Sequence, residues 1–293
     1  MTIITAMDNK KGGTGKTTTA INLGTYLAAA CGNRVLIIDL DSDRCITDGM
    51  AGGAFDAHTS NKLNILDCLA DIKHGFGSAI IRYDITPYAA AASQLASLVH
   101  MPYVTGGSVD LITGSEDLAE APVYFNQQKQ PVGTFDQSLH WMLRQPDVTE
   151  RWDQVILDIG TGWDLVTKTA IFAADEAIIP VEPASLSIEA FKRHNLRINK
   201  GNTDRRRAGL IGQTIIRGVL ISRYNAVSPV HQQFVSGMRQ MLAGAQIPCF
   251  TTVIPTSDAI LVAMHNHAPS WGQYPDDPGA QAFASLAKEI SVS

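Results

Sequence analysis

The sequence predicts an α/β protein whose doubly wound, mostly parallel sheet carries helices on both faces. A short β-branched run at 2–7 ends at a glycine-rich turn, apolar residues recur at helical spacing over 16–30, and 33–41 is a second apolar run. Strand, glycine turn, helix and strand form a βαβ unit, whose crossover connection makes its two strands parallel. Apolar runs then alternate with helical segments through most of the remaining chain.

The other strands are predicted from short apolar runs bounded by polar or turn-forming residues. Those runs are 109–113, 153–160, 175–183, 217–224 and 249–255. Apolar periodicity predicts helices over 134–146, 163–173, 186–200, 228–243, 258–267 and 278–290. The stretch 42–107 is rich in Ala, Gly and Ser. We interpret 49–107 as a helical insertion, with helices near 62–71 and 89–100, within a single domain that spans 1–293.

Composition narrows the classes of protein that need to be considered. With 293 residues, 45% of them hydrophobic and 17% charged, the chain has ample material for a core. It lacks any run of about 18 apolar residues and the basic, then apolar, start of a signal peptide, so we expect a cytoplasmic protein. Its four cysteines are scattered, which argues against a zinc site or a disulfide framework. The net charge of −5 gives no overall attraction to nucleic acid.

Residues 10–19, KKGGTGKTTT, lie where a phosphate-binding loop must lie, between the first strand and the first helix. Backbone N–H groups of a glycine turn and the positive end of a helix attract phosphate oxygens, and glycine lets the backbone approach them closely. Lys16 should reach the β- and γ-phosphates, and the Thr17 hydroxyl should bind Mg²⁺. The loop therefore predicts a bound nucleotide and Mg²⁺. The expected nucleotide-binding residues of this loop are Gly12, Gly13, Thr14, Gly15, Lys16, Thr17 and Thr18.

The stretch from Lys11 to Thr18, KGGTGKTT, resembles the deviant Walker A motif of the ParA/MinD ATPases, which have the P-loop NTPase fold. The ordinary motif requires glycine where Lys10 stands. In this family the lysine before the glycine pair reaches across a dimer to the partner's nucleotide. The resemblance implies that Lys11 and Lys16 are catalytic and that hydrolysis depends on an ATP-bound homodimer. A cation supplied in trans resembles an arginine finger, which is worth roughly 10³–10⁵ in rate.

Two acidic strand ends extend the resemblance. The run VLIIDLDSD resembles the family's second motif, which implies that Asp39 holds Mg²⁺ through water and that Asp41 orients the attacking water. The run QVILDIGTG resembles the Walker B strand, which implies that Asp158 also belongs to the Mg²⁺ site. An acid that ends a buried strand is costly to bury without a cation, which favours a metal role for Asp39 and Asp158 beside Thr17.

Other segments follow or depart from the family pattern. GVLISRYNAVSPVHQQ resembles the strand end and helix that flank the nucleotide base in this family, and the stretch that begins FTTVIPTSDAI resembles the run that leads into the last helix. By analogy, the resemblance implies base contacts from Asn225 and from the turn at Ile254 and Pro255. Alternatively, Pro255 simply ends a strand. The family's Pro-Gln-Gly-Asn is replaced by residues 42–45, SDRC, and its Thr-Pro-Pro by residues 160–162, GTG.

One basic stretch stands out in this acidic chain. Nine basic residues lie in 189–223 against only Glu189 and Asp204, a net +7, so the rest of the chain carries −12. Such a stretch is typical of a phosphate-backbone binder, although it can also be a solvated charged face. ATP-bound dimers of the family commonly bind DNA without sequence preference, so we expect non-specific double-stranded DNA as a partner. The expected contacts are Lys192, Arg193, Arg197, Lys200, Arg205, Arg206, Arg207 and Arg223.

The resemblance thus implies a ParA-type ATPase that positions or segregates a plasmid, a chromosome region or a protein body on the nucleoid. An adaptor bound to this cargo would stimulate ATP hydrolysis. A MinD-like, membrane-associated version needs a basic amphipathic C-terminal helix, whereas the chain ends QAFASLAKEISVS, so a membrane partner is not expected. A metabolic P-loop enzyme such as an amide-forming ligase stays an open alternative, because a second-substrate pocket could lie in 49–107.

Overall fold

The computed structural model describes residues 1–50, 63–70, 75–121, 135–183 and 188–292, and in them one eight-stranded sheet organises the protein. The strand order is β3-β4-β2-β5-β1-β6-β7-β8. All neighbouring strands are parallel except β3 and β4, which confirms the predicted doubly wound sheet. The strands are β1 (Ile3–Met7), β2 (Arg34–Leu40), β3 (Ile81–Tyr83), β4 (Ser108–Ile112), β5 (Gln154–Ile159), β6 (Glu176–Val181), β7 (Ile215–Tyr224) and β8 (Cys249–Pro255).

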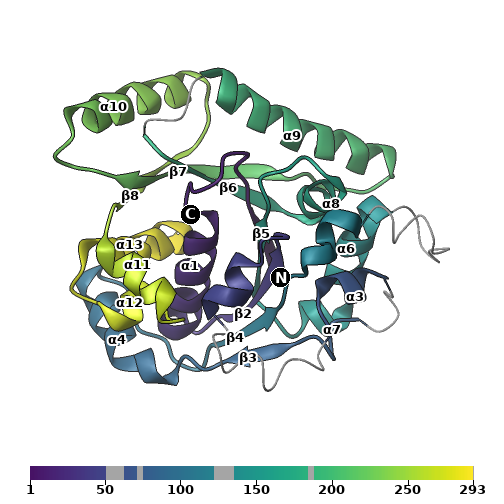
Figure 1. Ribbon diagram of the computed structural model, residues 1–293, viewed down its shortest axis with the longest axis horizontal. Coiled ribbons are helices and arrows are strands. Elements are labelled where there is room, and N and C mark those ends of the chain that lie inside the picture. Colours follow the sequence, from purple (N-terminus) through teal and green to yellow (C-terminus); the bar gives the residue numbers. More distant parts are fainter. Residues whose placement is uncertain (51–62, 71–74, 122–134, 184–187, 293) are drawn as a thin grey trace.

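Helices cover both faces of this sheet (Figure 1). One face is covered by α1 (Lys16–Cys31), α4 (Ala89–Leu98), α11 (Asp258–His265), α12 (Ser270–Gln273) and α13 (Pro278–Val292). The opposite face is covered by α3 (Ile65–Ala70), α6 (Phe135–Leu143), α7 (Pro146–Thr149), α8 (Leu165–Ala173), α9 (Ile188–Arg207) and α10 (Pro229–Gly244). Among the described residues, no helix has the combination of length and apolar character that crossing a bilayer requires.

Strand β2 is buried on both faces, which explains why its sequence is apolar without interruption. Val35 and Ile37 face the core shared with α1 and α13, whereas Leu36 and Ile38 face the core shared with α6 and α8. All four side chains are fully buried. A strand of a parallel sheet that is covered on both faces reads as a continuous apolar run, and its polar residues gather where it ends.

The stretch 49–107, predicted as a helical insertion, contains both helices and a strand among its described residues. Helices α3 and α4 lie in it, and Ile81–Tyr83 adds an antiparallel edge strand to the sheet. Ala92 and Leu95 of α4 are buried in the same core as α1, so this stretch contributes to the main fold. Part of the predicted insertion, 51–62 and 71–74, lies outside the described residues.

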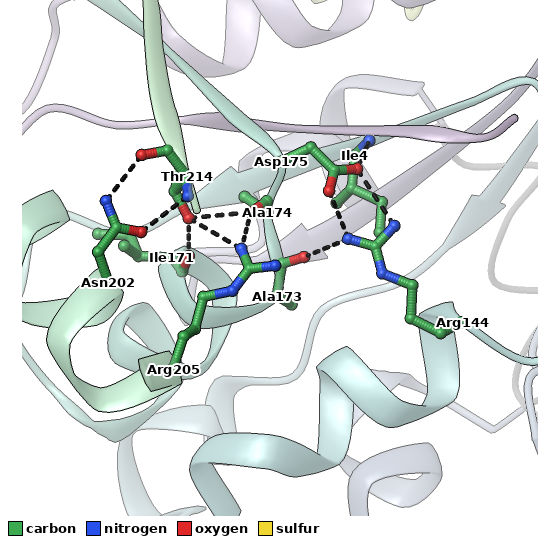
Figure 2. Close-up of polar contacts among 9 residues, drawn as sticks. All are labelled: Ile4, Arg144, Ile171, Ala173, Ala174, Asp175, Asn202, Arg205 and Thr214. Carbon is green, nitrogen blue, oxygen red and sulfur yellow. Dashed lines mark hydrogen bonds and ion pairs between the residues drawn. The ribbon is translucent and has the colours of Figure 1, made fainter. Parts of the chain in front are cut away.

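Two arginines hold the turn between α8 and β6, as Figure 2 shows. Arg144, directly after α6, forms an ion pair with Asp175, which also accepts a hydrogen bond from the Ile4 N–H at 3.0 Å. Arg205, near the end of α9, donates to the Ala174 carbonyl at 2.7 Å and is almost fully buried. The Arg205 contact fixes the C-terminal end of α9 against the end of the sheet at which strands β1 and β6 begin.

Candidate nucleotide-binding site

The loop between β1 and α1 has the backbone conformation of a phosphate cradle. Gly13 and Gly15 have φ angles of 72° and 89°, in the left-handed region that disfavours other side chains. Strand β7 supports the loop from one side, because the Ser222 hydroxyl donates to the Thr14 carbonyl and the Arg223 guanidinium donates to the Gly13 carbonyl at 3.0 Å. The loop is therefore shaped by its glycines and held by side chains from a distant part of the sequence.

Helix α1 begins with the lysine and threonine predicted to contact phosphate and metal. Its N-terminus offers unpaired N–H groups and the positive end of the helix dipole. Lys16 is buried, and the Thr17 hydroxyl donates to Asp158 Oδ2 at 2.7 Å. Asp158 of β5 lies directly opposite Asp39 of β2 in the parallel register. Three separate segments of sequence thus bring these four residues together.

Both carboxyl groups are fully buried, and burial dominates their acidity. Burial raises the pKa of Asp39 to about 6, even though the Thr47 hydroxyl and N–H donate to its Oδ2 at 2.7 and 2.9 Å. Burial, followed by the charge of Asp39, raises the pKa of Asp158 to about 8, with Thr17 and Lys16 acting in the opposite direction. Two acids that disfavour each other's charge form a site that a cation would stabilise.

The residues present fit a Mg²⁺ ion. Asp158 Oδ1 is buried and has no hydrogen-bond partner among the described residues, and a partnerless carboxylate oxygen is costly to bury. Mg²⁺ prefers oxygen ligands and usually combines one or two carboxylates with nucleotide phosphates and water. Within the described ranges, no group of three or more His, Cys, Asp and Glu side chains is placed to hold a metal by itself. Thr17, Asp39 and Asp158 instead suit a Mg²⁺ ion shared with a bound phosphate.

Asp41 lies just beyond β2, next to the loop that follows β5. Its Oδ1 accepts a hydrogen bond from the Asp43 N–H at 3.1 Å. A Cβ atom at Gly160 would lie only 3.3 Å from that same oxygen, so the glycine gives the carboxylate its room. The family pattern implies that Asp41 orients water, and its place between the ends of β2 and β5 is compatible with that role.

Lys11 forms an ion pair with Glu182, which directly follows β6, with Nζ 3.0 Å from Oε2. The lysine side chain is 53% exposed. Lys11, and to a lesser extent Arg223 and His231, lower the pKa of Glu182 below its ordinary value. Lys11 therefore lies at the surface beside the phosphate cradle, with an anion as its partner in the single chain.

Asn225 and Pro255, predicted to contact the base, come from adjacent strand ends. Asn225 directly follows β7, and Pro255 ends β8 with Tyr224 as its Cα partner. Asn225 is exposed, and its side-chain oxygen accepts from the Val227 N–H at 3.1 Å. The two residues lie at the same sheet edge as Arg223, which contacts the phosphate loop, and base contact from them stays a prediction.

The basic residues predicted to contact DNA divide into three groups. Lys200, Arg206, Arg207 and Arg223 are exposed. Arg197 and Arg205 are only 8% and 2% exposed, and their guanidinium groups donate hydrogen bonds to backbone carbonyls inside the protein. The prediction of DNA contact is therefore wrong for these two. The helical spacing identified the helix correctly but could not tell which of its basic residues face inward. Lys192 and Arg193 belong to α9, and their side chains lie outside the described residues.

Several residues of the site were not foreseen from the sequence. Thr47 holds Asp39, and Glu182 pairs with Lys11. Arg197 pairs with Asp8 at the start of the phosphate loop and lies 5.0 Å from the ring centroid of Trp163. An acid directly after β1 and a tryptophan directly after the Gly160–Gly162 turn were visible signals, but their partners are remote in sequence.

Comparisons with known proteins support the assignment that the phosphate loop suggested. The model of the AAA_31 family, described as an AAA domain, matches residues 1–206. The chromosome-partitioning ATPase Soj of Thermus thermophilus is 27% identical over 294 residues, which cover 97% of this chain and 94% of Soj.

Two solved structures share the fold. One is the cobyrinic acid a,c-diamide synthase of Mycobacterium smegmatis with bound ADP and magnesium, with a TM-score of 0.72, 20% identity and coverage of 99% of this chain and 94% of that one. The other is a Borrelia burgdorferi protein described as a putative plasmid partition protein bound to AMPPNP, with a TM-score of 0.71, 18% identity and coverage of 100% and 99%. At such identities these two likenesses speak for the fold alone.

The family model spans well over half of the chain, and the Soj relative spans nearly all of it. The resemblance drawn from the phosphate loop is thereby confirmed: the protein belongs to the AAA_31 family, as a member of the ParA/Soj family of ATPases.

Proposed function

We propose that the chain is an ATP-hydrolysing switch that dimerises with ATP, binds non-specific DNA in that state and positions a cargo. The observation that carries this proposal is the buried constellation of Thr17, Asp39 and Asp158 beside Lys16, together with a partly exposed Lys11 on the same loop. Its relative Soj is called a chromosome-partitioning ATPase, which favours DNA or a DNA-bound body as the cargo.

In this proposal, ATP phosphates lie in the cradle formed by Gly12–Thr18. Lys16 and the N–H groups at the start of α1 offset the charge of the β- and γ-phosphates. Thr17, Asp39 and Asp158 would hold Mg²⁺, which would supply positive charge beside the transferred phosphoryl group. Asp41 orients the attacking water.

Dimerisation supplies the last part of the site. Lys11 lies at the surface and leaves Glu182 to reach the γ-phosphate of the facing protomer. A positive charge brought to the phosphates only in the dimer makes hydrolysis depend on association, in the manner of an arginine finger. An adaptor bound to the cargo would then act by stimulating hydrolysis, after which the dimer dissociates and releases DNA.

The DNA-binding surface is proposed to include the exposed Lys200, Arg206 and Arg207 of α9, with Lys192 and Arg193 on the same helix and Arg223 near the loop. A dimer doubles the number of such contacts, so the affinity should rise steeply on dimerisation. Because the contacts are to phosphate, the affinity should fall steeply with salt, and nucleoid DNA is the proposed cellular target.

The test is binding to a random-sequence duplex with a non-hydrolysable ATP analogue, with ADP and without nucleotide, over a salt series. We expect tight binding only with the ATP analogue, with a log–log salt slope of about −0.9 per phosphate neutralised. Lys11→Ala should abolish it. Lys10→Ala is the matched control, because Lys10 is the adjacent exposed lysine and should leave the nucleotide dependence unchanged.

Absence of DNA binding in every nucleotide state, with ATP still bound, would contradict the proposed switch. The next assays would then be binding to anionic vesicles and ATP-dependent amide formation on small carboxylic acids. Equal loss in Lys11→Ala and Lys10→Ala would instead show that the lysines act only through general charge.

A further inference from the structure

Arg197 of α9 reaches from the basic helix to the turn that follows Asp158. One of its terminal nitrogens donates to the Gly162 carbonyl at 2.7 Å and to the Thr161 carbonyl at 3.3 Å. The other forms an ion pair with Asp8 Oδ1 at 3.2 Å. Arg197 is 8% exposed and Asp8 is fully buried. A single guanidinium thus joins α9, the end of β1 and the turn beyond β5.

That turn touches the candidate nucleotide site from two sides. Gly160 lies against the Asp41 carboxylate, as the 3.3 Å distance from its hypothetical Cβ shows. A Cβ at Gly12 would lie 3.9 Å from the Thr161 methyl group, so Thr161 adjoins the phosphate loop. Residues 160–162 therefore lie between the atoms proposed to bind phosphate and the guanidinium of Arg197.

Trp163 makes a second connection between the same turn and α9. Its ring centroid lies 5.0 Å from the Arg197 guanidinium, 5.9 Å from Lys168 Nζ and 6.0 Å from Lys200 Nζ. Cations placed within this range of an indole face are attracted to it. Lys200 is also one of the exposed basic residues of α9. A shift of Trp163 would therefore move a cation of the proposed DNA-binding surface.

We propose that Arg197 is a positioning residue that couples the turn 160–163 to helix α9, so that the γ-phosphate state of the nucleotide sets the placement of the basic surface. The planar guanidinium holds two carbonyls and one carboxylate in a fixed fork, a geometry that lysine does not reproduce. A turn that moves when the γ-phosphate binds must carry Arg197 with it or break these bonds. The nucleotide site and helix α9 are then coupled through the turn 160–163, which has one position for each nucleotide state.

The inference rests on the proposed function for its DNA readout and deepens it by naming the residue that links nucleotide to DNA. A merely structural role for Arg197 is the competing explanation. Arg205 is the matched control because it lies on the same helix and is also a buried arginine. It donates to the Ala174 carbonyl just before β6 begins, at the end of the strands opposite to the nucleotide site. A purely structural role predicts the same behaviour for Arg197→Lys and Arg205→Lys.

The experiment compares wild type, Arg197→Lys and Arg205→Lys in three measurements. These are the affinity for a fluorescent ATP analogue, the tryptophan emission with non-hydrolysable ATP analogue or with ADP, and the ratio of DNA affinities in those two states. Trp163→Phe identifies the part of the emission that comes from Trp163. If Arg197→Lys does not fold, Arg197→Gln replaces it, because its carboxamide can still donate to one carbonyl.

We expect Arg197→Lys to bind the ATP analogue within about threefold of wild type but to lose about tenfold in the DNA-affinity ratio, within the usual range of coupling between two sites. The Trp163 difference between the two nucleotide states should also disappear. Arg205→Lys should keep both signals even if its melting temperature falls.

Two results would overturn the coupling role. One is a Trp163 emission that does not distinguish the nucleotide states in wild type, and the other is an unchanged response in Arg197→Lys. The emission arm needs no DNA. If wild type fails to bind DNA but Trp163 still reports the nucleotide through Arg197, the coupling role stands and only the DNA-binding proposal fails.

Discussion

The Thr17 hydroxyl lies 2.7 Å from Asp158 Oδ2, and the other oxygen of that carboxylate is buried without a hydrogen-bond partner among the described residues. Asp158 also lies opposite Asp39 across two neighbouring strands. Two acids thus share one buried site, and among the described residues Asp158 Oδ1 has no donor, whereas Asp39 has three. The arrangement is costly without a cation and favourable with one, as expected where function and stability compete.

Replacing Asp158 by Asn should stabilise the nucleotide-free protein. The amide oxygen can still accept from Thr17, and the variant does not have to take up the proton that the buried Asp158 binds on folding. We expect the free energy of unfolding to rise by about 1–2 kcal/mol and Mg²⁺-dependent nucleotide binding to fall strongly. Thermal melts with and without Mg²⁺–ATP measure both effects. A variant that melts lower than wild type in the absence of nucleotide would contradict the argument.

The same raised pKa gives a pH dependence with a defined sign. The ordinary pKa of Asp158 is 3.8 and its folded pKa is about 8, so between these values the folded state holds a proton that the unfolded state releases. Stability contributed by this group is fully present below the unfolded pKa and is lost as the pH rises toward 8. The melting temperature of the nucleotide-free wild type should therefore fall between pH 6 and 8 relative to Asp158→Asn, and parallel curves would exclude this origin.

Features that depend on local sequence pattern, or on residues where a strand ends, could be predicted from the sequence. The parallel sheet, the glycine loop and the acids at the ends of β2 and β5 follow from apolar runs and from the need to place charge where a strand leaves the core. Strand β3, only three residues long, has too little local signal to be distinguished from the helices around it. The direction in which each basic residue of α9 faces also depends on partners remote in sequence, such as Asp8 for Arg197.

Removing the anion that holds Lys11 should favour the ATP-bound dimer. In the single chain the Lys11–Glu182 ion pair has to break before Lys11 can reach a facing protomer. Partly exposed ion pairs are worth about 0–1 kcal/mol, so Glu182→Gln should tighten ATP-dependent dimerisation by about two- to fivefold with little change in melting temperature. Sedimentation with the non-hydrolysable analogue measures this. Weaker dimerisation would mean that Glu182 assists the dimer.

Substitutions of the buried and of the exposed arginines at the end of α9 should have different effects, on stability for the buried residue and on DNA binding for the exposed ones. Arg205→Met removes the donor to Ala174 and should cost about 1–3 kcal/mol in unfolding free energy. Arg206→Ala and Arg207→Ala should leave stability within about 0.5 kcal/mol but reduce the salt slope of DNA binding by about one each. Denaturant melts and salt-dependent binding of the three variants distinguish the roles. Equal DNA-binding loss without destabilisation in Arg205→Met would restore it as a contact residue.

His140 should make the fold sensitive to mild acid. It lies edge-on to Phe172, with a centroid separation of 5.6 Å, and its buried Nδ1 has no hydrogen-bond partner within the part of the chain that the structure describes. Burial, followed by the charges of Arg144 and Arg205, lowers its pKa from 6.5 to about 4, with Asp175 acting in the opposite direction.

Between those two pKa values the unfolded chain binds a proton at His140 that the folded protein excludes, so stability falls as the pH drops from 6.5 toward 4. His140→Phe keeps an aromatic ring against Phe172 and removes the titration, so its melting temperature should decline less over this interval. Comparing the two proteins cancels the opposite trend of the buried acids Asp39 and Asp158, because both proteins contain them. A decline of equal size in both would mean that acid sensitivity arises elsewhere, with His140 protonating as easily in the folded chain as in the unfolded one.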